Sequence, residues 1–340
     1  MFYNSILVTG GAGFIGSHTT LELLRAGFKV VVADNLSNSS YESLRRVSQI
    51  VGCEPVFLNV DVRDRKALNQ LFKNHSIDAV LHFAGLKAVG ESVSNPLDYY
   101  DNNVHGSQVL LSTMAEAGIF KFIFSSSATV YGETSQIPIS EDCPVGRLTN
   151  PYGRSKLMVE DMLRDLVTSD PRWRIAVLRY FNPVGAHESG LIGEHPRGVP
   201  NNLLPYLAQV AVGKLHELSV FGNDYPTKDG TGVRDYIHVM DLAEGHLCAL
   251  TAIQQLTGFN VWNLGTGQGY SVLEIIEAFE RVSGREIPYK MVPRRPGDIA
   301  TCYADPNKAQ LELGWVAKRN LEQMLEDAWR WQYQNPNGFN

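Results

Sequence analysis

The residues that decide the fold are Ile6-Leu7-Val8-Thr9-Gly10-Gly11-Ala12-Gly13-Phe14-Ile15-Gly16, close to the start of the chain. The three aliphatic residues predict a short buried strand, and the amphipathic stretch 17–26 predicts a helix directly after the glycines. Glycine adopts positive φ at no steric cost and lets other groups approach the backbone. A strand, a glycine-rich turn and a helix in this order indicate the first unit of an open α/β sheet.

Strands and helices are expected to alternate through the first half of the chain. Apolar runs occur at 6–8, 29–33, 56–60, 79–84, 122–124 and 175–178, with amphipathic stretches between them, such as 17–26 and 65–74. This alternation predicts a Rossmann-type, doubly wound parallel sheet over residues 1–180.

The pattern changes after Tyr180. Residues 182–202 hold four Gly and three Pro, which predicts a long loop of the kind that contacts ligands. Residues 181–340 are expected to form a smaller α/β domain, with some segments returning to the first. Its expected strands are 219–221, 261–264 and 287–292, and its expected helices are 202–212, 239–250 and 271–282.

Composition excludes several classes of function. The 340 residues are 44% hydrophobic and 19% charged, as in ordinary globular domains, and the net charge of −6 argues against a nucleic-acid partner. No apolar run reaches membrane length, so a cytoplasmic protein without a membrane partner is expected. The four cysteines lie far apart, and no histidine or carboxylate cluster has the spacing of metal ligands, so neither a disulfide framework nor a metal site is predicted.

The glycine turn predicts a dinucleotide site. Gly10, Gly13 and Gly16 would let a pyrophosphate reach the backbone N–H groups at the helix N-terminus. Asp34 ends the next strand, where a carboxylate accepts hydrogen bonds from an adenosine ribose and repels a 2′-phosphate, which favours NAD. The alternatives are a glycine turn that binds nothing and an aspartate that only forms a turn.

A second constellation predicts acid–base chemistry. Ser127 ends an expected strand, and Asn150-Pro151 reads as the cap and first position of a helix that carries Tyr152 and Lys156 on one face. A tyrosine base at pH 7 needs its pKa lowered by about 3 units, which positive charge from Lys156 and a nicotinamide would favour. A lone Tyr-x-x-x-Lys also occurs by chance. The motif indicates catalysis here because it follows both the glycine turn and the strand that ends in Ser127.

With these motifs the sequence resembles the extended short-chain dehydrogenase/reductase family, and within it the UDP-hexose 4-epimerases, over nearly its whole length. The stretches 83–92 and 178–187 are the most epimerase-like. The resemblance implies a Rossmann domain with a UDP-sugar-binding domain, and catalysis by Tyr152, Lys156 and Ser127. It implies NAD contacts from Gly10, Gly13, Phe14, Ile15, Gly16, Asp34, Asn35, Leu36, Ser37, Asn38, Ser39, Asp61, Val62, Phe83, Ala84, Gly85, Lys87, Asn102, Ser127, Tyr152, Lys156 and Phe181.

The resemblance also implies a substrate site and an activity. Substrate contacts are expected from Lys87, Ser127, Tyr152, Asn182, Asn202, Leu203, Phe221, Arg234, Tyr236, Arg295, Asp298 and Cys302. The implied reaction interconverts UDP-galactose and UDP-glucose through a 4-keto intermediate. The small side chain of Cys302 extends the expected substrate range to UDP-N-acetylhexosamines, because it leaves room beside C2 of the sugar. The alternative is that Cys302 only packs and Tyr303 fills this room. A homodimer through helices near 100–117 and 153–168 is also implied.

Two rival functions fit the sequence less well. A nucleotide-sugar 4,6-dehydratase needs an Asp-Glu pair after the serine of this strand, and Ala128-Thr129 stands there instead. A cofactor-binding scaffold without chemistry would use the same fold, but would not need Tyr152, Lys156 and Ser127 together.

Overall fold

The computed structural model describes residues 5–134, 136–146, 148–295 and 297–340. They form two compact units, each described here by itself. Unit 1 comprises Met1–Glu133, Pro144–Tyr180 and Ala243–Trp262, and unit 2 comprises Thr134–Cys143, Phe181–Leu242 and Asn263–Asn340.

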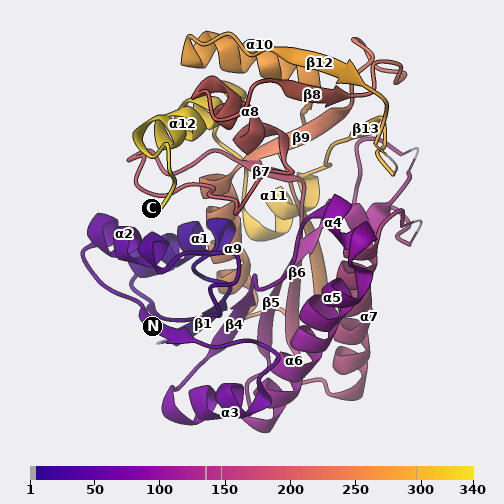
Figure 1. The fold of residues 1–340 in the computed structure, drawn as a ribbon. Helices are drawn as coiled ribbons and strands as arrows, with labels where there is room; N and C mark the ends of the chain where they lie inside the picture. Colours follow the sequence, from indigo (N-terminus) through magenta and orange to yellow (C-terminus); the bar gives the residue numbers. More distant parts are fainter. Residues whose placement is uncertain (1–4, 135, 147, 296) are drawn as a thin grey trace. The chain divides into compact units, whose positions relative to one another are not determined.

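Unit 1 is built on a seven-stranded sheet with the strand order β10-β6-β5-β4-β1-β2-β3 (Figure 1). The strands are β1 (Ser5–Thr9), β2 (Lys29–Asp34), β3 (Val56–Asn59), β4 (Ala79–His82), β5 (Lys121–Ser127), β6 (Arg174–Tyr180) and β10 (Gly258–Leu264). β1 to β6 pair in parallel. The strand order reverses between β1 and β4, which confirms the Rossmann-type fold and marks the crevice where such sheets bind ligands.

Helices follow each of the first strands. They are α1 (Phe14–Arg25), α2 (Tyr41–Val51), α3 (Arg65–Asn74), α4 (Val89–Ser94), α5 (Pro96–Tyr99), the π-helix η1 (Tyr100–His105), α6 (Gly106–Glu116), the 3₁₀ turn η2 (Ala128–Tyr131), α7 (Pro151–Ser169) and α9 (Val239–Ala252). The Asn150 side chain accepts a hydrogen bond from the Gly153 N–H at 2.8 Å, which confirms the predicted start of α7.

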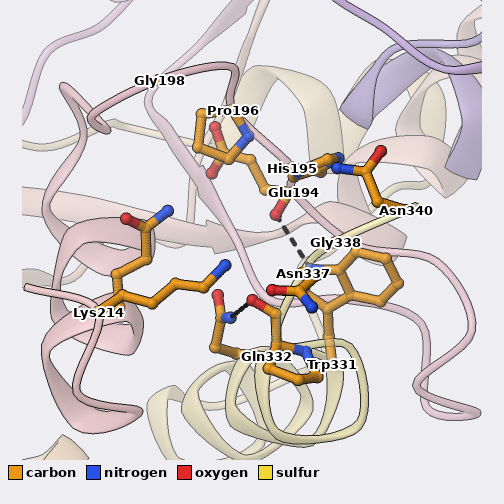
Figure 2. Close-up of a pocket in the computed structure, with 12 residues that line it drawn as sticks. Glu194, His195, Pro196, Gly198, Lys214, Trp331, Gln332, Asn337, Gly338 and Asn340 are labelled. Carbon is orange, nitrogen blue, oxygen red and sulfur yellow. Dashed lines mark hydrogen bonds between the residues drawn. The ribbon is translucent and has the colours of Figure 1, made fainter.

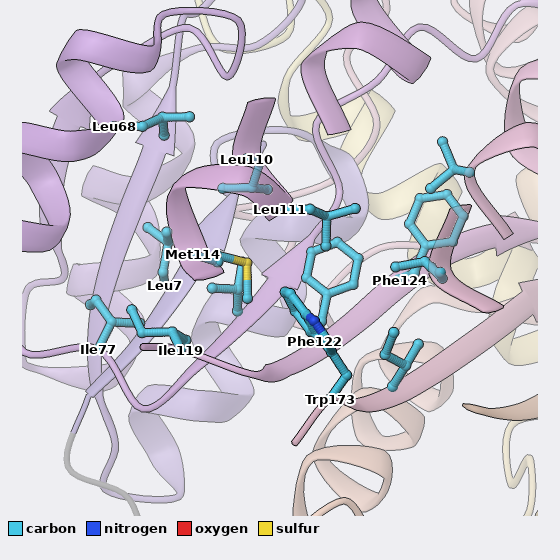
Figure 3. Packing of buried hydrophobic residues seen from close by; sticks show 14 of the residues in the cluster. Leu7, Leu68, Ile77, Leu110, Leu111, Met114, Ile119, Phe122, Phe124 and Trp173 are labelled. Atoms are coloured by element: carbon cyan, nitrogen blue, oxygen red, sulfur yellow. The ribbon is translucent and has the colours of Figure 1, made fainter. Parts of the chain in front are cut away.

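One apolar core joins α3, α6 and α7 to a single face of this sheet. Alternate strand residues such as Phe122 and Phe124 point toward Leu110, Met114 and other helix residues (Figure 3). These side chains are almost fully buried, and this burial is what holds the helices against the strands. On the opposite face of β5 and β6, Ile123, Ala176 and Leu178 are buried as well, as expected for a parallel sheet that is covered on both faces.

Unit 2 contains smaller sheets and its own core. Its strands are β7 (Asn182–Val184), β8 (Leu218–Phe221), β9 (Val233–His238), β11 (Gly269–Ser271), β12 (Tyr289–Val292) and β13 (Thr301–Cys302), and its helices are α8 (Leu203–Ala211), α10 (Val272–Ser283), α11 (Asn307–Leu313) and α12 (Leu321–Gln334). β9 lies between β11 and β13 and also pairs with β7, while β8 pairs with β12. Apolar residues of α8, α10 and α12 pack together with those of β8 and β9.

The structure differs from the sequence prediction in the second half of the chain. The strands β7, β9, β11 and β13 and the helices α11 and α12 were not among the expected elements. The run 261–264 was expected among the elements of the smaller domain, but it belongs to β10, the edge strand beside β6. A short apolar run does not reveal its pairing partner, because periodicity is a local signal and pairing is not. Within the described ranges, no helix combines the length and apolar composition that crossing a membrane requires.

Candidate active site

The glycine turn after β1 packs tightly against the loop after β4. Gly10 has φ of 68°, and a Cβ at this position would lie 2.6 Å from the backbone N of Ala84. A Cβ on Gly16 would lie 2.2 Å from the Gly10 carbonyl oxygen. Gly13 precedes α1 without a side-chain cap, so Phe14, Ile15 and Gly16 form a first turn whose N–H groups suit an anion. This cradle fits a dinucleotide pyrophosphate.

Asp34 ties this turn to the loop that follows β2. Its buried carboxylate accepts hydrogen bonds from the N–H groups of Ala12 at 3.0 Å and Leu36 at 2.9 Å, and from the Ser39 hydroxyl at 2.8 Å. Leu36 has φ of 56°, a conformation that costs a bulky residue about 1–3 kcal/mol. Backbone strain of this kind persists where surrounding bonds enforce it, and it concentrates at ligand sites.

The residues predicted to contact NAD continue beyond this loop. Asn35 donates to Asp61 at 2.9 Å and accepts from the Ser37 N–H at 3.0 Å, while Asn38 is exposed. Hydrogen bonds from Arg63 hold the pKa of Asp61 well below its usual value. Asp61 is thus held by Asn35 and Arg63, and Arg63 is itself held by Asp101, to which it donates at 2.6 Å. The neighbouring Val62 is buried and would collide with any side chain at Gly106.

The loop after β4 is braced by a residue that the sequence did not reveal. Asn103, in η1, accepts from the Leu86 N–H at 2.8 Å and donates to the Leu86 carbonyl and the Ser155 hydroxyl, each at 3.0 Å. Its preceding neighbour Asn102 was a predicted cofactor contact. The loop itself holds the other predicted contacts, Phe83, Ala84, Gly85 and Lys87. A π-turn leaves no simple periodic signal, so only the structure could place Asn103 here.

The three predicted catalytic residues lie together. Tyr152 and Lys156 occupy one face of α7, and the Ser127 hydroxyl at the end of β5 hydrogen-bonds the Tyr152 phenol. The Lys156 ammonium donates to the Ser125 carbonyl at 2.7 Å and lies 5.9 Å from the centre of the Tyr152 ring. The structure thus brings these three residues together, and their catalytic roles stay a prediction.

The pKa of the tyrosine differs from the expected direction. Burial raises the pKa of Tyr152, and the hydrogen bond from Ser127 only partly offsets this. Burial also lowers the pKa of Lys156 to about 8, against the opposing charge of Glu160. The protein's own groups thus do not supply the predicted lowering, because desolvation of a phenolate outweighs them.

In unit 2, predicted substrate residues gather on the sheet around β9. Arg234 and Tyr236 lie on β9, with Asn182 opposite Tyr236 and Cys302 opposite Arg234. The Arg234 guanidinium lies 3.8 Å from the Asp298 carboxylate and donates to the Val233 carbonyl at 2.9 Å. Burial raises the pKa of Tyr236 to about 12, so its phenol stays neutral.

A second group of predicted residues lies at the ends of β8 and α8. The Arg295 guanidinium stacks 3.8 Å from the centre of the Phe221 ring, and burial lowers its pKa. Asn202 and Leu203 begin α8, where the Asn202 amide donates to Glu194 at 3.4 Å. Phe181, predicted to contact NAD, belongs to unit 2, and that contact stays a prediction.

Asp235 supports this sheet and was not among the predicted residues. Its buried carboxylate accepts hydrogen bonds from the N–H groups of Thr266, Gly267 and Ala304 at 2.8 to 3.1 Å. It thereby ties β9 to the segments that follow β10 and β13. An isolated aspartate gives no sequence signal for such a role.

A separate hollow of about 500 Å³ lies elsewhere in unit 2. Figure 2 shows it between the segment around Glu194 and His195 and the C-terminal residues, with Lys214 and Trp331 on its walls. None of its described lining residues is a predicted site residue. Among the residues that the structure describes, no group of three or more His, Cys, Asp or Glu side chains could hold a metal ion.

The tight contact of Gly10 generates a testable prediction. Gly10→Ala should lower the nicotinamide content of the purified protein by roughly tenfold or more, because the added Cβ meets the Ala84 backbone and the φ is strained. Gly27→Ala is the matched control, since Gly27 also has positive φ but no atom within 4 Å of its Cβ. Cofactor released by denaturation measures the effect, and equal cofactor content in the two variants would contradict the assignment of the cradle.

Comparisons with known proteins agree with this geometry. A model of the family described as GDP-mannose 4,6 dehydratase matches residues 7–328. The UDP-glucose 4-epimerase of Bacillus subtilis (strain 168) is 63% identical over 335 residues, which cover 98% of each chain. The crystal structure of UDP-glucose 4-epimerase from Bifidobacterium longum in complex with NAD+ and UDP is 56% identical and has a TM-score of 0.96, covering 98% of this chain and 100% of that one.

A third relative has a name that mentions a wider substrate range. The structure of the UDP-Glc/GlcNAc 4-epimerase from Campylobacter jejuni is 39% identical, with a TM-score of 0.85, and covers 97% of this chain and 99% of that chain. All three relatives match nearly the whole length of the chain. With its glycine turn, its Tyr152, Lys156 and Ser127 cluster and these matches, the chain belongs to the UDP-glucose 4-epimerase family.

Proposed function

We propose that the protein interconverts UDP-galactose and UDP-glucose by inverting C4, with NAD held tightly in unit 1. The observation that carries this is the contact of Tyr152 with Ser127 beside the anchored ammonium of Lys156. Support comes from the 63% identity to an epimerase over 98% of the chain.

Unit 1 would perform the proton transfer. Tyr152 would take the proton from the C4 hydroxyl, and Ser127 would hydrogen-bond the same oxygen. NAD, when bound, accepts and returns the C4 hydride, and its positive charge favours the phenolate form of Tyr152. The 4-keto sugar would then be the shared intermediate. Because the hydride returns to the same carbon, the reaction is redox neutral and the cofactor need not leave.

Unit 2 would hold the nucleotide. Arg234 and Arg295 suit the diphosphate, because guanidinium groups form charge-assisted bonds to phosphate oxygens. Asp298 suits ribose hydroxyls, and the Asn182 and Asn202 amides can donate to phosphate. Since the UDP group would carry most of the contacts, the hexose could turn about its diphosphate linkage and offer its opposite face to the hydride.

The dehydratase alternative is weaker. Dehydration needs a further acid and base, yet Ala128 and Thr129 occupy η2, and the Thr129 hydroxyl donates to Ser127 at 3.0 Å. No carboxylate stands in this turn. A scaffold without chemistry would not need to bury Lys156 on the Ser125 carbonyl, since desolvating an ammonium is costly.

Purified protein should convert UDP-galactose to UDP-glucose with no cofactor added, and Tyr152→Phe should lower turnover by about 100-fold or more. UDP binding should change little, because the UDP contacts lie on other residues. Turnover and UDP affinity are measured side by side. The proposal fails if the wild type carries no nicotinamide and stays inactive after NAD is supplied, or if Tyr152→Phe keeps full turnover where chemistry limits the rate.

The substrate range is proposed to include UDP-N-acetylhexosamines. Cys302 lies opposite Arg234 in a parallel pair, so both side chains start on the same face of the sheet. Burial raises the pKa of Cys302 to about 11, which keeps the thiol neutral and small. Tyr303 packs beside Gly269, where an added Cβ would lie 3.2 Å from its ring, so it has a place other than the sugar pocket.

Cys302→Tyr should therefore reduce turnover of UDP-N-acetylglucosamine by roughly tenfold or more while sparing UDP-glucose, because the ring takes the space of the acetamido group. Cys302→Ser is the control that preserves the space. Assaying both substrates with the three proteins gives the ratio. An unchanged ratio in Cys302→Tyr, or a wild type inactive on the N-acetylated substrate, would contradict this reading.

A homodimer is also proposed, through helices near 100–117 and 153–168. Support comes from apolar side chains exposed on this side of unit 1, including Met158 at 45% and, on the adjoining α5, Leu97 at 78%. Met158→Glu should shift the mass in sedimentation equilibrium toward the monomer, because a buried carboxylate disfavours association. Leu311→Glu, at an 84% exposed site of unit 2, should not. A wild-type monomer at micromolar concentration would refute the dimer.

The cytoplasm is the proposed location. No disulfide joins the four cysteines, all of which lie in the described part of the chain, as expected in a reducing compartment. Fractionation of cells that express the protein would test this, and recovery with the membrane fraction would overturn it.

A further inference from the structure

Three consecutive serines at the end of β5 each bind one residue on a single face of α7. The contacts are Ser127 with the Tyr152 phenol, the Ser125 carbonyl with the Lys156 ammonium at 2.7 Å, and the Ser126 hydroxyl with the Glu160 carboxylate at 2.6 Å. Tyr152, Lys156 and Glu160 follow one another at intervals of four, so they form one row along the helix. The first two contacts belong to the catalytic machinery, and the third has no part in the chemistry described so far.

Glu160 is fully buried, and both oxygens of its carboxylate accept hydrogen bonds. Its Oε1 accepts from the Ser126 hydroxyl and from the Arg179 Nε at 3.0 Å, and its Oε2 accepts from the Arg179 guanidinium at 2.6 Å. Glu160 is 0% exposed and Arg179 is 2% exposed. Arg179 also lies 4.7 Å over the Tyr131 ring. Burying two charges is costly and is often no more stabilising than an apolar pair, so stability alone is a poor explanation for this arrangement.

The location of the pair offers another explanation. Ser126 lies between the two serines that engage the catalytic residues, and Arg179 lies opposite Ser126 on β6. The hydrogen bonds of Glu160 therefore fix the position of α7 relative to both β5 and β6. Such bonds are directional, whereas apolar packing is not. A displacement of about 1 Å in catalytic groups can lower the rate by about 100-fold.

We propose that Glu160, with Ser126 and Arg179, is a positioning residue for the epimerase reaction: it holds α7 in register with β5, so that Tyr152 meets Ser127 and Lys156 stays on the Ser125 carbonyl. The inference rests on the proposed function. Glu160 touches neither substrate nor cofactor in this role and acts only through Tyr152 and Lys156.

The carboxylate also has an electrostatic effect on the row. The charged and titratable groups around Tyr152 and Lys156 are His82 from β4, Tyr99 from α5, Arg179 and Tyr180 from β6, and Glu160 from α7. Burial, and to a lesser degree the charge of Lys156, lowers the pKa of His82 to about 3, so it is neutral. Glu91 of α4 accepts a hydrogen bond from the Tyr99 phenol at 3.0 Å, and Glu160 is the carboxylate that favours the ammonium form of Lys156.

The central test is Ser126→Ala, which removes one hydrogen bond but leaves Glu160 and Arg179 paired. We expect kcat to fall by roughly tenfold while KM for UDP-glucose stays within about twofold, since alignment changes and UDP contacts do not. The control is Thr113→Val in α6, which removes another buried hydroxyl, one bonded to the Val109 and Leu110 carbonyls. It should keep the wild-type kcat.

The variant Glu160→Gln tests the effect of the carboxylate charge on Lys156. Loss of the carboxylate should move the alkaline limb of the kcat–pH profile to lower pH by about half a unit or more, because the ammonium of Lys156 is less favoured and is lost earlier as the pH rises. This variant leaves a buried guanidinium without its counter-charge. If it does not fold, Ser126→Ala decides the matter.

Each outcome has a separate meaning. If wild-type protein is inactive, the proposed function fails. If the wild type is active but Ser126→Ala matches Thr113→Val in kcat, Glu160 is only structural and the positioning role is wrong. A folded Glu160→Gln with the wild-type pH profile would also overturn the proposal.

Discussion

The functional part of unit 1 depends on one constraint: parallel strands end at the same edge of their sheet. A crossover must return the chain behind the sheet before the next strand begins, so each carboxyl end is left beside the others. The glycine turn follows β1, Asp34 ends β2, the braced loop follows β4, and Ser127 ends β5. The contact of Gly10 with Ala84 occurs where the strand order reverses. The predicted cofactor cradle and the predicted catalytic hydroxyl of Ser127 are therefore products of the same topology.

The features that the sequence predicted are those with a strong local signal. About a dozen adjacent residues are enough to recognise the strand and the glycine turn, and two residues, Asn150 and Pro151, are enough to recognise the start of α7. The spacing of Tyr152 and Lys156 follows from the helix period alone. Once the fold class was known, the carboxyl edge brought Ser127 to Tyr152 without further information. Local pattern and topology were sufficient for this part of the site.

The features that the sequence did not predict depend on partners far away in the chain. The structural role of Glu160 depends on its bonds to Arg179 and Ser126, and that of Asn103 depends on its bonds to Leu86 and Ser155. The edge position of β10 depends on pairing with β6. The direction of the Tyr152 pKa depends on how completely the phenol is desolvated, which no spacing reveals. In each case the missing information was a long-range contact or a degree of burial.

Asp34 has an expected role in cofactor binding and a structural role in holding the backbone around it. As an expected ribose acceptor it would choose between the two nicotinamide coenzymes, and through the Ala12 and Leu36 N–H groups it also holds together the turn and the strained loop on either side. Removing its charge to admit a phosphorylated ribose would release that loop at the same time. An exchange of Asp34 alone would consequently disturb the backbone on both sides of it, in addition to the ribose contact that it is expected to make.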